Sequence, residues 1–357
     1  MIYSRYMKGS LGTYRIETFD DFRNVAQLYQ YSRVILTALQ IDLFTAVGSR
    51  SWSMKALAGR LKVSPRGLEI LCRNLAALGL LVKNGRAYRN SPLSTAELNR
   101  KSPAYRAEYL DLIQSHWDDY AQLTASVRSG KPLEEDEPDS SKWRRRFTWA
   151  MHQRSREQAQ QVARVLNLKE AKTLLDLGGG PGTYAMAFLS KKPSLRATVA
   201  DRPAALRVAR EIASTHPARA RLSYVPLDFM KDPLPSPYDI VWLSNVIHIY
   251  SAEENLALFR KIATVLSPGG RIIIHDSVLT DPQGLYPIDT TAFALAMLLY
   301  TDTGNTYPAR EVIQWLEQAG YSDVKMLSGL RSRKDGENGL IQGRMKAKRR
   351  ARRSLPK

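Results

Sequence analysis

The sequence of residues 174–184 is LLDLGGGPGTY, an apolar run that ends in an acid and then breaks into glycines. The run is typical of the end of a buried parallel strand. The glycines predict a tight turn into a helix over about 184–191, because only glycine lets the backbone come so close to a ligand. Free N–H groups of that helix would point at the ligand. Thr183 stands where a dinucleotide fingerprint has its third glycine, so the spacing argues against NAD.

A second apolar segment, residues 197–201 (ATVAD), closes on the carboxylate of Asp201. This acid follows Asp176 by 25 residues, where a parallel βαβ unit places a carboxylate against ribose hydroxyls. An isolated acid here could instead cap the next helix. Because it follows a glycine loop, we expect the carboxylates of Asp176 and Asp201 to face one nucleoside.

Length and composition predict a two-domain cytoplasmic protein. The chain has 357 residues and an apolar share of 44%, which is more than one ordinary domain needs. Its single cysteine, Cys72, allows no intramolecular disulfide and no thiolate metal cluster, which fits a reducing compartment. No apolar window reaches the ~18 residues of a membrane span, and the first ten residues lack the apolar core of a signal peptide. We expect no metal and no membrane partner.

Nearly half of the net charge of +19 lies in one short C-terminal segment, where 11 Lys and Arg stand against two acids from Arg331 to the end. Such a run is usually a solvated, disordered end, although it could also bind a polyanion. We expect residues 346–357 to be a disordered basic tail, and nucleic acid is not the expected partner.

The N-terminal region has the pattern of a winged helix. Residues 22–47 carry apolar side chains at helical spacing, which predicts one long helix or a pair of helices. Two shorter helices, over 54–61 and 66–80, precede a hairpin over 81–88 whose turn lies at Asn84.

A winged helix can bind DNA, or it can serve as a scaffold or dimerisation surface. The helix over 66–80 offers Arg66, Arg73 and Asn74 for DNA contacts, whereas Glu69 opposes that use. Dimerisation is therefore the favoured interpretation of this region.

The rest of the chain alternates strands and helices. Residues 105–127 are expected to be helical, and 129–142 has the composition of a linker. Further expected helices are 143–168, 251–266, 288–300 and 308–319, and further expected strands are 222–228, 239–247, 271–276, 324–330 and 339–345. This alternation predicts an α/β fold with a doubly wound, mainly parallel sheet whose ligand lies at the carboxyl ends of the strands. We divide the chain into a winged-helix domain (1–130), a linker (131–142), a catalytic domain (143–345) and the tail (346–357).

Five motifs together point to a family. LLDLGGGPGTY, VADRP, LDFMKDPLP, SNVIHIYSAEE and LSPGGRIIIHD, behind a winged helix, resemble the class I S-adenosylmethionine-dependent O-methyltransferases of the caffeic acid and acetylserotonin type. The resemblance extends to about Met345. It implies a Rossmann-like catalytic domain, S-adenosylmethionine as cofactor, a homodimer formed through the N-terminal domain, and a small aromatic or polyketide-like acceptor that is methylated on a hydroxyl.

The resemblance also implies a set of cofactor-binding residues. Phe229 would lie against the adenine, though it could equally be a core residue. Ser244 stands where the family has another cofactor contact, often a lysine. The full set is Asp176, Gly178, Gly180, Asp201, Asp228, Phe229 and Ser244.

In this family the general base follows the fourth strand, where this sequence has His248. Asp276 stands at the position of the acid that orients the base. The neighbouring His275 is a competing candidate, but alternation along a strand should point it away from the side of Asp276. The chain departs from the family at Ile249, which follows the base, and at Thr306, which replaces a third catalytic carboxylate.

Three of the expected helices supply the residues expected to line the acceptor pocket. The predicted set is Trp117, Phe147, Met151, Arg154, Met297 and Tyr300. Flexible thioethers and aromatic rings suit a flat acceptor. Arg154 is charged where relatives are commonly neutral or have histidine, so it could bind an acidic group of the acceptor or form a structural ion pair.

Two other functions stay open at this level. Some members of the family keep the cofactor but catalyse hydroxylation, decarboxylation or pericyclic reactions, so the fold does not settle the reaction. A regulator that senses S-adenosylmethionine and binds DNA through its winged helix is the alternative from a different class.

Overall fold

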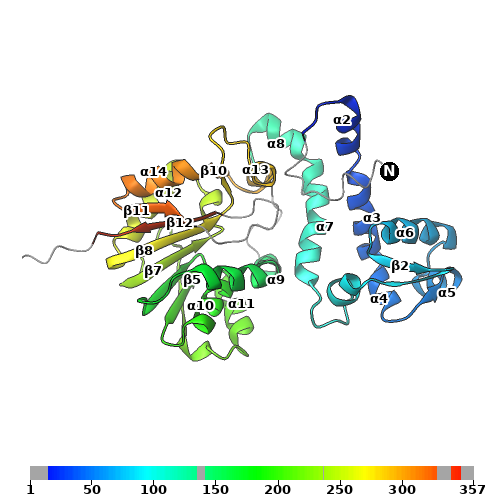
Figure 1. Cartoon of the computed structure of the whole chain (residues 1–357), viewed down its shortest axis with the longest axis horizontal. Helices are drawn as coiled ribbons and strands as arrows, with labels where there is room; N and C mark the ends of the chain where they lie inside the picture. The colour runs from blue at the N-terminus through cyan, green and yellow to red at the C-terminus, as the bar shows by residue number, and fades with distance from the viewer. Residues whose placement is uncertain (1–14, 135–140, 236, 328–338, 347–357) are drawn as a thin grey trace, which may run out of the picture. The chain divides into compact units, whose positions relative to one another are not determined.

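The computed structural model describes residues 15–134, 141–235, 237–327 and 339–346. The chain divides into two compact units, residues 15–115 and the unit that begins at His116 (Figure 1). No helix in the described ranges is long and apolar enough to cross a membrane. The predicted basic tail lies outside the described residues, apart from Lys346.

A seven-stranded sheet forms the centre of the larger unit. Its strand order is β11-β12-β8-β7-β4-β5-β6. Strands β4 to β8 are mutually parallel, and β12 and β11 add an antiparallel edge. The bounds are β4 (Thr173–Leu177), β5 (Arg196–Asp201), β6 (Leu222–Pro226), β7 (Tyr238–Ser244), β8 (Leu266–Asp276), β11 (Ser322–Met326) and β12 (Gly339–Arg344). The predicted doubly wound α/β fold is confirmed.

Helices cover both faces of the sheet, because the strands are apolar on both sides. One core packs α9 (Ser141–Val165), α10 (Thr183–Lys191) and α11 (Pro203–Ala213) against the first face. The other packs α12 (Ala252–Ala263) and α14 (Ala309–Gln318) against the second face. Successive side chains of β4 alternate between these cores: Leu174 lies in the first, and Leu175 lies in the second.

The order of the strands fixes where a ligand can bind. From β4 the chain runs outward through β5 and β6, and it then returns to β7 on the other side of β4. The order therefore reverses between β4 and β7, and open α/β sheets bind ligands at the carboxyl ends of the strands beside such a reversal. The glycine loop follows β4, and the segment with His248 follows β7.

Strand β7 is shorter than predicted. It ends at Ser244, and Asn245 has a left-handed backbone with φ of 55°, which a strand cannot accommodate. A 3-10 turn, Ile247–Ile249, follows and carries His248. The apolar pattern of residues 239–247 continues past the end of the strand because Val246 and Ile247 are buried as well.

The smaller unit contains the predicted winged helix. Helix α5 (Met54–Leu61) and helix α6 (Pro65–Ala77) precede the hairpin of β2 (Leu81–Asn84) and β3 (Ala87–Asn90), to which β1 (Trp52–Ser53) adds a short strand. The hairpin turns at Gly85, whose φ is 58°. Cys72 is fully buried in α6, and burial raises its pKa to about 12, so it is a core residue.

Residues 22–47 form parts of three helices rather than one or two: α2 (Phe19–Ala26), α3 (Tyr29–Gln40) and α4 (Leu43–Val47). The break before α4 lies at Asp42, whose backbone is left-handed with φ of 53°. The apolar spacing continues through this break, so periodicity alone could not locate it.

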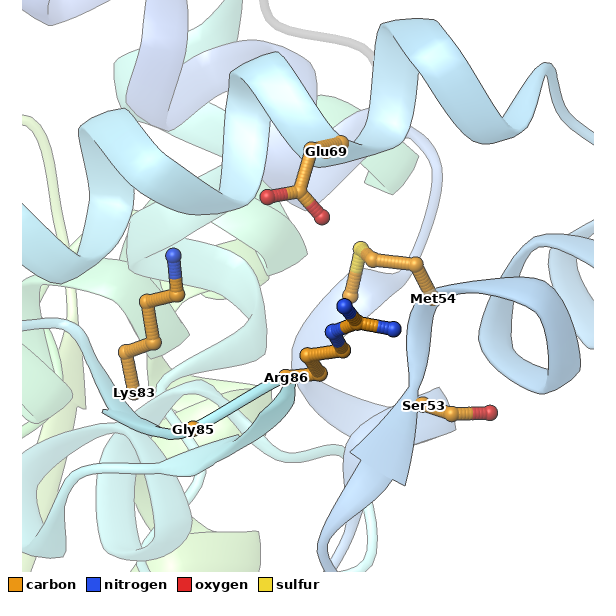
Figure 2. A pocket seen from close by; sticks show the side chains of 6 residues that line it. All are labelled: Ser53, Met54, Glu69, Lys83, Gly85 and Arg86. Atoms are coloured by element: carbon orange, nitrogen blue, oxygen red, sulfur yellow. The ribbon is translucent and has the colours of Figure 1, made fainter.

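A hollow of about 350 Å³ lies between helix α6 and the hairpin, and Figure 2 shows the side chains that line it. The carboxylate of Glu69 lies on the helix side of this hollow, and Lys83 and Arg86 extend from the hairpin. Glu69 accepts a hydrogen bond of 3.1 Å from the hydroxyl of Tyr88. A carboxylate held on this helix would repel a phosphate backbone, so the hollow does not favour the DNA-binding alternative.

The boundary between the two compact units lies between Ser115 and His116, within α7 (Ala107–Ala121). The sequence instead predicts that the first domain ends at residue 130. Two hydrogen bonds account for the difference. The hydroxyl of Tyr300 donates to Asp119 at 2.6 Å, and the N–H of Leu133 donates to the carbonyl of Leu299 at 2.9 Å. Both join the region after residue 115 to α13 (Ile288–Tyr300).

Candidate active site

The glycine loop after β4 has a backbone that only glycine can adopt without strain. Gly178, Gly180 and Gly182 have φ of 67°, 49° and 68°, in the left-handed region. A Cβ on Gly178 would lie 2.9 Å from Cγ2 of Val246, and one on Gly182 would lie 3.1 Å from Cγ2 of Val199. The loop is therefore packed tightly against the ends of the neighbouring strands, with backbone rather than side chains available to a ligand.

Asp176 is buried beneath this loop and does not face outward with Asp201 as expected. Its side chain is 1% exposed, and a Cβ on Gly179 would lie 2.6 Å from its carboxyl carbon. It accepts a hydrogen bond of 3.3 Å from the N–H of Ala185. Burial, the largest cause, raises its pKa to about 7. Asp176 thus supports the loop from inside the protein.

We expect Asp176→Asn to stabilise the ligand-free protein at pH 8, by about 2–4 kcal/mol. Because the folded pKa of about 7 lies above the ordinary 3.8, the carboxyl contributes its full stability below pH 3.8 and loses it as the pH rises through 7. Asparagine is neutral at every pH and can still accept from Ala185. Denaturant unfolding at pH 4 and pH 8 measures the effect, which should be small at pH 4.

The control for this experiment is Asp323→Asn. The carboxylate of Asp323 is exposed and bonded to Lys325, which lowers its pKa. Removing that charge should give no gain in stability at pH 8. Equal stability of wild type and Asp176→Asn at pH 8 would mean that Asp176 ionises without cost in the folded protein.

Asp201 lies at the carboxyl end of β5, beside the glycine loop. Its Oδ2 accepts a hydrogen bond of 2.7 Å from the N–H of Gly180, and its Oδ1 accepts one of 2.6 Å from the N–H of Arg202. Burial raises its pKa, and these hydrogen bonds oppose that shift. The carboxylate is therefore fixed at the rim of the loop, in the position that a ribose hydroxyl would require.

The loop after β6 carries the predicted cofactor contacts Asp228 and Phe229, of which Phe229 lies beside the glycine loop. The ring of Phe229 lies 3.2 Å from the position that a Cβ on Gly178 would occupy. Its carbonyl accepts a hydrogen bond of 2.9 Å from Nζ of Lys261, which holds the loop. Asp228 folds back on its own loop, where Oδ1 accepts from the N–H of Met230 at 3.1 Å. Gly178, Asp201 and Phe229 thus line one glycine-walled cradle, which fits a nucleoside with a flat base and ribose hydroxyls.

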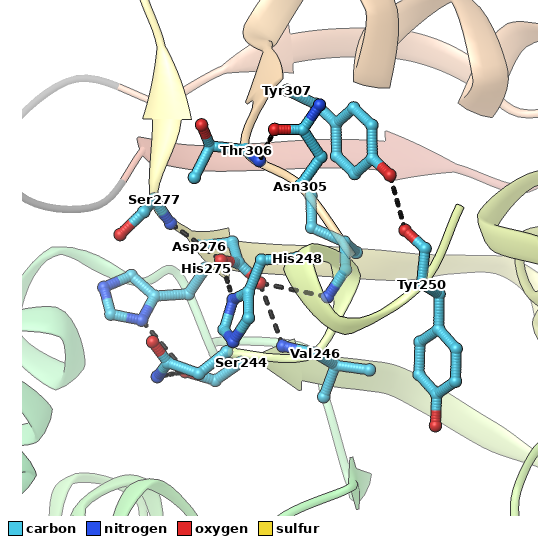
Figure 3. A network of polar contacts seen from close by, with 12 residues as sticks. Ser244, Val246, His248, Tyr250, His275, Asp276, Ser277, Asn305, Thr306 and Tyr307 are labelled. Carbon is cyan, nitrogen blue, oxygen red and sulfur yellow. Dashed lines mark hydrogen bonds and ion pairs between the residues drawn. The ribbon is translucent and has the colours of Figure 1, made fainter. Parts of the chain in front are cut away.

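The half-buried Ser244 and the fully buried His275 form a polar pair on the other side of β8 from Asp276 (Figure 3). Oγ of Ser244 lies 3.0 Å from Nδ1 of His275, whose ring stacks on Trp242 at 5.5 Å and meets Tyr184 edge-on at 5.3 Å. Burial lowers the pKa of His275 to about 4, so the ring is neutral. Strand alternation had predicted that His275 points away from Asp276, and the structure agrees.

His248 and Asp276 form a hydrogen-bonded pair (Figure 3). Nδ1 of His248 lies 2.6 Å from Oδ1 of Asp276. The carboxylate is fully buried and also accepts three backbone N–H groups: Val246 at 2.9 Å, Ile247 at 3.0 Å and Ser277 at 2.8 Å. With four donors around it, the carboxylate can only accept, so Nδ1 carries the proton and Nε2 has the free lone pair.

The backbone around His248 is fixed by residues that motif spacing did not reveal. The side-chain amide of Asn255 donates to the carbonyl groups of Ile247, Tyr250 and Ser251 at 2.8, 3.1 and 2.9 Å. A Cβ on Gly304 would lie 2.4 Å from the carbonyl oxygen of His248. Asn255 belongs to α12, and Gly304 lies in the loop after α13. Nothing in the sequence beyond the presence of an amide and a glycine indicates these contacts.

Family comparisons identify the chain. A model of the O-methyltransferase domain matches residues 109–322, and a model of the O-methyltransferase dimerisation domain matches residues 24–100. The chain belongs to the O-methyltransferase family. It is an S-adenosylmethionine-dependent O-methyltransferase, and its dimerisation domain indicates that it forms a homodimer.

The enzyme is similar to several biosynthetic methyltransferases. It is 28% identical to the tetracenomycin polyketide synthesis 8-O-methyl transferase TcmO of Streptomyces glaucescens, over 85% of this chain and 92% of that protein. It is also 28% identical to the 3-hydroxy-5-methyl-1-naphthoate 3-O-methyltransferase of Streptomyces sahachiroi, over 87% and 91%. An O-methyltransferase structure from Nostoc punctiforme shares its fold, with a TM-score of 0.80 at 26% identity, over 92% of this chain and all of that one.

Helix α13 of the methyltransferase presents a row of large side chains near the histidine. The ring of Phe293, which the sequence analysis did not single out, meets the ring of His248 edge-on at 4.8 Å. Met297 is buried one turn later, and Tyr300 bonds to Asp119 and packs 5.7 Å from His116. Phe293 occupies the same helical stripe as Met297 and Tyr300, and this spacing could have revealed it.

Helix α9 places Phe147, Met151 and Arg154 on a second stripe with the same spacing. Phe147 stacks on Trp143 at 5.0 Å, Met151 is half-buried and Arg154 is exposed. Within the described residues, none of these three side chains has a hydrogen bond, ion pair or ring contact with His248. Trp117 is half-buried on α7. Thr306, at the position of the third carboxylate, is buried, and its N–H bonds to the side chain of Asn305 at 2.8 Å.

Proposed function

We propose that this enzyme methylates a hydroxyl group on a small aromatic or polyketide-like metabolite, with His248 as the general base. The hydrogen bond between Nδ1 of His248 and Asp276 is the main support, because it leaves Nε2 as the basic nitrogen. The flat, apolar row of Phe293, Met297 and Tyr300 suits an aromatic acceptor. The relatives include enzymes of polyketide and naphthoate methylation.

In the proposed step, Nε2 of His248 takes the proton of the acceptor hydroxyl while the acceptor oxygen forms its bond to the methyl group. The cofactor, S-adenosylmethionine, would supply that methyl group from a sulfonium, a strong electrophile; the bond from methyl to sulfur would break, and its electron pair would stay on the sulfur of the departing thioether. Asp276 keeps the proton on Nδ1 and stabilises the imidazolium that forms. Phe293 packs against the ring and limits its rotation.

The test is an assay of methyl transfer to a panel of phenols, naphthols and hydroxylated polyketides, followed by mass spectrometry. A product heavier by one methylene, about 14 Da, on an oxygen atom supports the proposal. If acceptors are consumed through hydroxylation or decarboxylation, without any methylated product, the enzyme instead uses the cofactor for a different reaction.

We propose that Asp201 binds the ribose hydroxyls of the cofactor within the glycine cradle. Asp201→Ala should weaken the binding of S-adenosylhomocysteine by about 1–3 kcal/mol, because two hydrogen bonds to a carboxylate are lost. Calorimetry measures the affinity of each variant for S-adenosylhomocysteine. Asp201→Asn is the matched variant: it can still accept from Gly180, so a smaller loss separates the ribose contact from support of the loop. Tight binding of NAD by the wild type would contradict the assignment of the cradle.

We propose that residues 15–115 form the homodimer interface and that the unit from His116 onward carries catalysis. Helix α2 exposes Phe19 to 75% and Phe22 to 52%, and exposed aromatic residues of this kind favour burial in an interface. Light scattering should give twice the chain mass of 40.3 kDa; a species of the single mass would contradict the proposal. The single cysteine still favours a cytoplasmic location, which cell fractionation would test.

A further inference from the structure

Helix α12 presents two polar side chains to the segments that carry the candidate site. Its buried face consists of Asn255, Leu258, Phe259 and Ile262, which have the spacing of one side of a helix. Leu258, Phe259 and Ile262 are apolar and belong to the core, whereas Asn255 is 0% exposed and carries an amide. A buried amide costs free energy unless it is hydrogen-bonded. The bonds that Asn255 makes therefore account for its place in an apolar face.

The side chain of Asn255 bonds to the turn that carries His248. Its Nδ2 lies within 3.1 Å of three carbonyl oxygens of this turn, those of Ile247, Tyr250 and Ser251. Asp276, from β8, accepts two backbone N–H groups of the same turn. The turn is thus bonded to a buried amide through its carbonyl groups and to a buried carboxylate through its N–H groups. Asp276 also bonds to the ring of His248, whereas these bonds of Asn255 all go to backbone groups.

The second polar side chain is Lys261, six residues after Asn255 and in the last turn of α12. Its Nζ donates to the carbonyl groups of Phe229 and Met230 at 2.9 and 3.2 Å. A cation in a last turn also interacts favourably with the helix dipole, but the neighbouring Arg260 supplies that charge from an exposed position. The bonds of Lys261 reach the loop after β6, whose Phe229 ring lies beside the glycine loop.

The two segments that bond to α12 are in contact with each other. The ring of Tyr250, whose carbonyl accepts from Asn255, meets the ring of Phe229 edge-on at 6.0 Å. Phe229 is itself the residue whose carbonyl accepts from Lys261. The two segments follow β7 and β6, at the carboxyl edge of the sheet. One helix is therefore bonded both to the segment of the histidine and to a wall of the cofactor cradle.

We propose that α12 is a positioning helix for the reaction, in which Asn255 orients His248 and Lys261 places Phe229 at the cofactor cradle. Each side chain acts through backbone carbonyl groups, and neither one touches the reacting atoms. Among the described residues, the side-chain bonds of each go to one segment alone, so Asn255 should control the rate and Lys261 the affinity for the cofactor. This inference rests on the proposed function, because it concerns the same histidine and the same cradle.

The first variant is Asn255→Leu, which replaces the amide with an apolar side chain of similar size. We expect kcat to fall about 10- to 100-fold, because the turn loses the bonds to its carbonyl groups and the ring of His248 loses its fixed orientation. Affinity for S-adenosylhomocysteine, measured by calorimetry, should stay the same. Asn255→Ser keeps one hydroxyl donor, so its kcat should lie between those of Asn255→Leu and the wild type.

The matched control is Asn90→Leu. Asn90 is 4% exposed in the other unit, and its Nδ2 donates to the carbonyl groups of Phe44 and Gly48 at 2.7 and 3.0 Å. It is therefore a buried amide with the same kind of bonds, away from His248 in the chain. Thermal unfolding should show that Asn90→Leu and Asn255→Leu are both destabilised, and Asn255→Leu alone should lose kcat.

A double variant distinguishes positioning of His248 from a general loosening of the fold. If Asn255 acts through His248, Asn255→Leu should have little further effect on kcat when His248 is already alanine. A loosened fold would instead lower kcat by the same factor with and without the histidine. Asn255→Ser provides the same comparison should Asn255→Leu not fold.

The second arm uses Lys261→Met, which keeps the length of the side chain and removes its ammonium group. Binding of S-adenosylhomocysteine should weaken about 10-fold, whereas kcat at saturating cofactor should stay close to that of the wild type. Lys261→Arg can still donate and should recover part of the affinity. Arg260→Met removes the same charge from the adjacent exposed position and should match the wild type. When Phe229 is already alanine, Lys261→Met should weaken binding little further.

The inference is overturned if Asn255→Leu and Asn90→Leu lower kcat equally, if Lys261→Met binds S-adenosylhomocysteine as tightly as the wild type, or if both α12 variants lower kcat and affinity together. The proposed function fails in a different way. Wild-type turnover by His248→Ala refutes the proposed base, and with it the role of Asn255, whereas the calorimetry on Lys261→Met does not depend on that result. A wild type that does not bind S-adenosylhomocysteine refutes the proposed cofactor cradle itself.

Discussion

Replacing His248 with alanine is expected to lower kcat by about 10²- to 10⁴-fold, with the affinity for S-adenosylhomocysteine unchanged. The histidine is 7% exposed, and its Nδ1 is hydrogen-bonded to Asp276. Nε2 is therefore the ring nitrogen that can accept a proton. Without it the acceptor oxygen must attack while still protonated. Positioning of the acceptor beside the sulfonium would remain, so the residual rate should still exceed the rate in solution.

The measurement is kcat with an authentic acceptor across a range of pH, together with calorimetry for cofactor affinity. The wild-type profile should contain an ionisation that His248→Ala lacks. His216→Ala is the control, because His216 belongs to the same unit and bonds to Ser190, away from the pair. If His248→Ala turns over at the wild-type rate with the same pH profile, the general-base role is wrong and proximity carries the reaction.

The second large effect is expected from Asp276→Asn, which should lower kcat by about 10- to 100-fold. An amide has one acceptor oxygen, whereas the carboxylate serves His248 through one oxygen and the N–H groups of Val246 and Ile247 through the other. If the amide nitrogen faces His248, the ring changes tautomer and Nε2 becomes protonated. If it faces the backbone, two N–H groups lose their acceptor.

The double variant separates these effects from unrelated damage. His248→Ala combined with Asp276→Asn should be little slower than His248→Ala alone, because the two residues act as one unit. Thermal unfolding of each variant reports the backbone cost separately from kcat. Losses that multiply in the double variant would show that Asp276 acts on the reaction by a route independent of His248.

The sequence predicted the features that follow from local patterns. Glycine spacing, the acid at the end of β5 and the apolar alternation of strands and helices are each dictated by a few neighbouring residues, and they led to the fold and to a nucleoside site. The resemblance of five motifs to a known family implied S-adenosylmethionine and the role of His248. Helix α13 was predicted at its observed bounds, because its apolar run is flanked by Pro287 and a polar loop.

What the sequence left out depends on contacts between distant segments. Asn255 hydrogen-bonds to carbonyl groups of the turn around His248, and Gly304 packs against the carbonyl group of His248. An asparagine or a glycine in a sequence does not by itself predict such a contact. The burial of Asp176 depends on how tightly the glycine loop closes over it. The left-handed Asn245 ends β7 inside an apolar run, where periodicity gives no signal. Tyr300 joins α13 to α7 through Asp119, a pairing of residues 181 positions apart.

The four hydrogen bonds to Asp276 have a consequence for how this enzyme can change over evolution. One buried carboxylate bonds both to His248, the base that we propose, and to the backbone of the turn that carries it. A substitution there should therefore alter the proposed chemistry and the turn at once. The side chains of the stripes on α9 and α13 do not combine two such roles, because they can be replaced without disturbing a backbone turn. New acceptors should therefore be acquired by mutation of those helices, and the histidine and its acid should be inherited together or lost together.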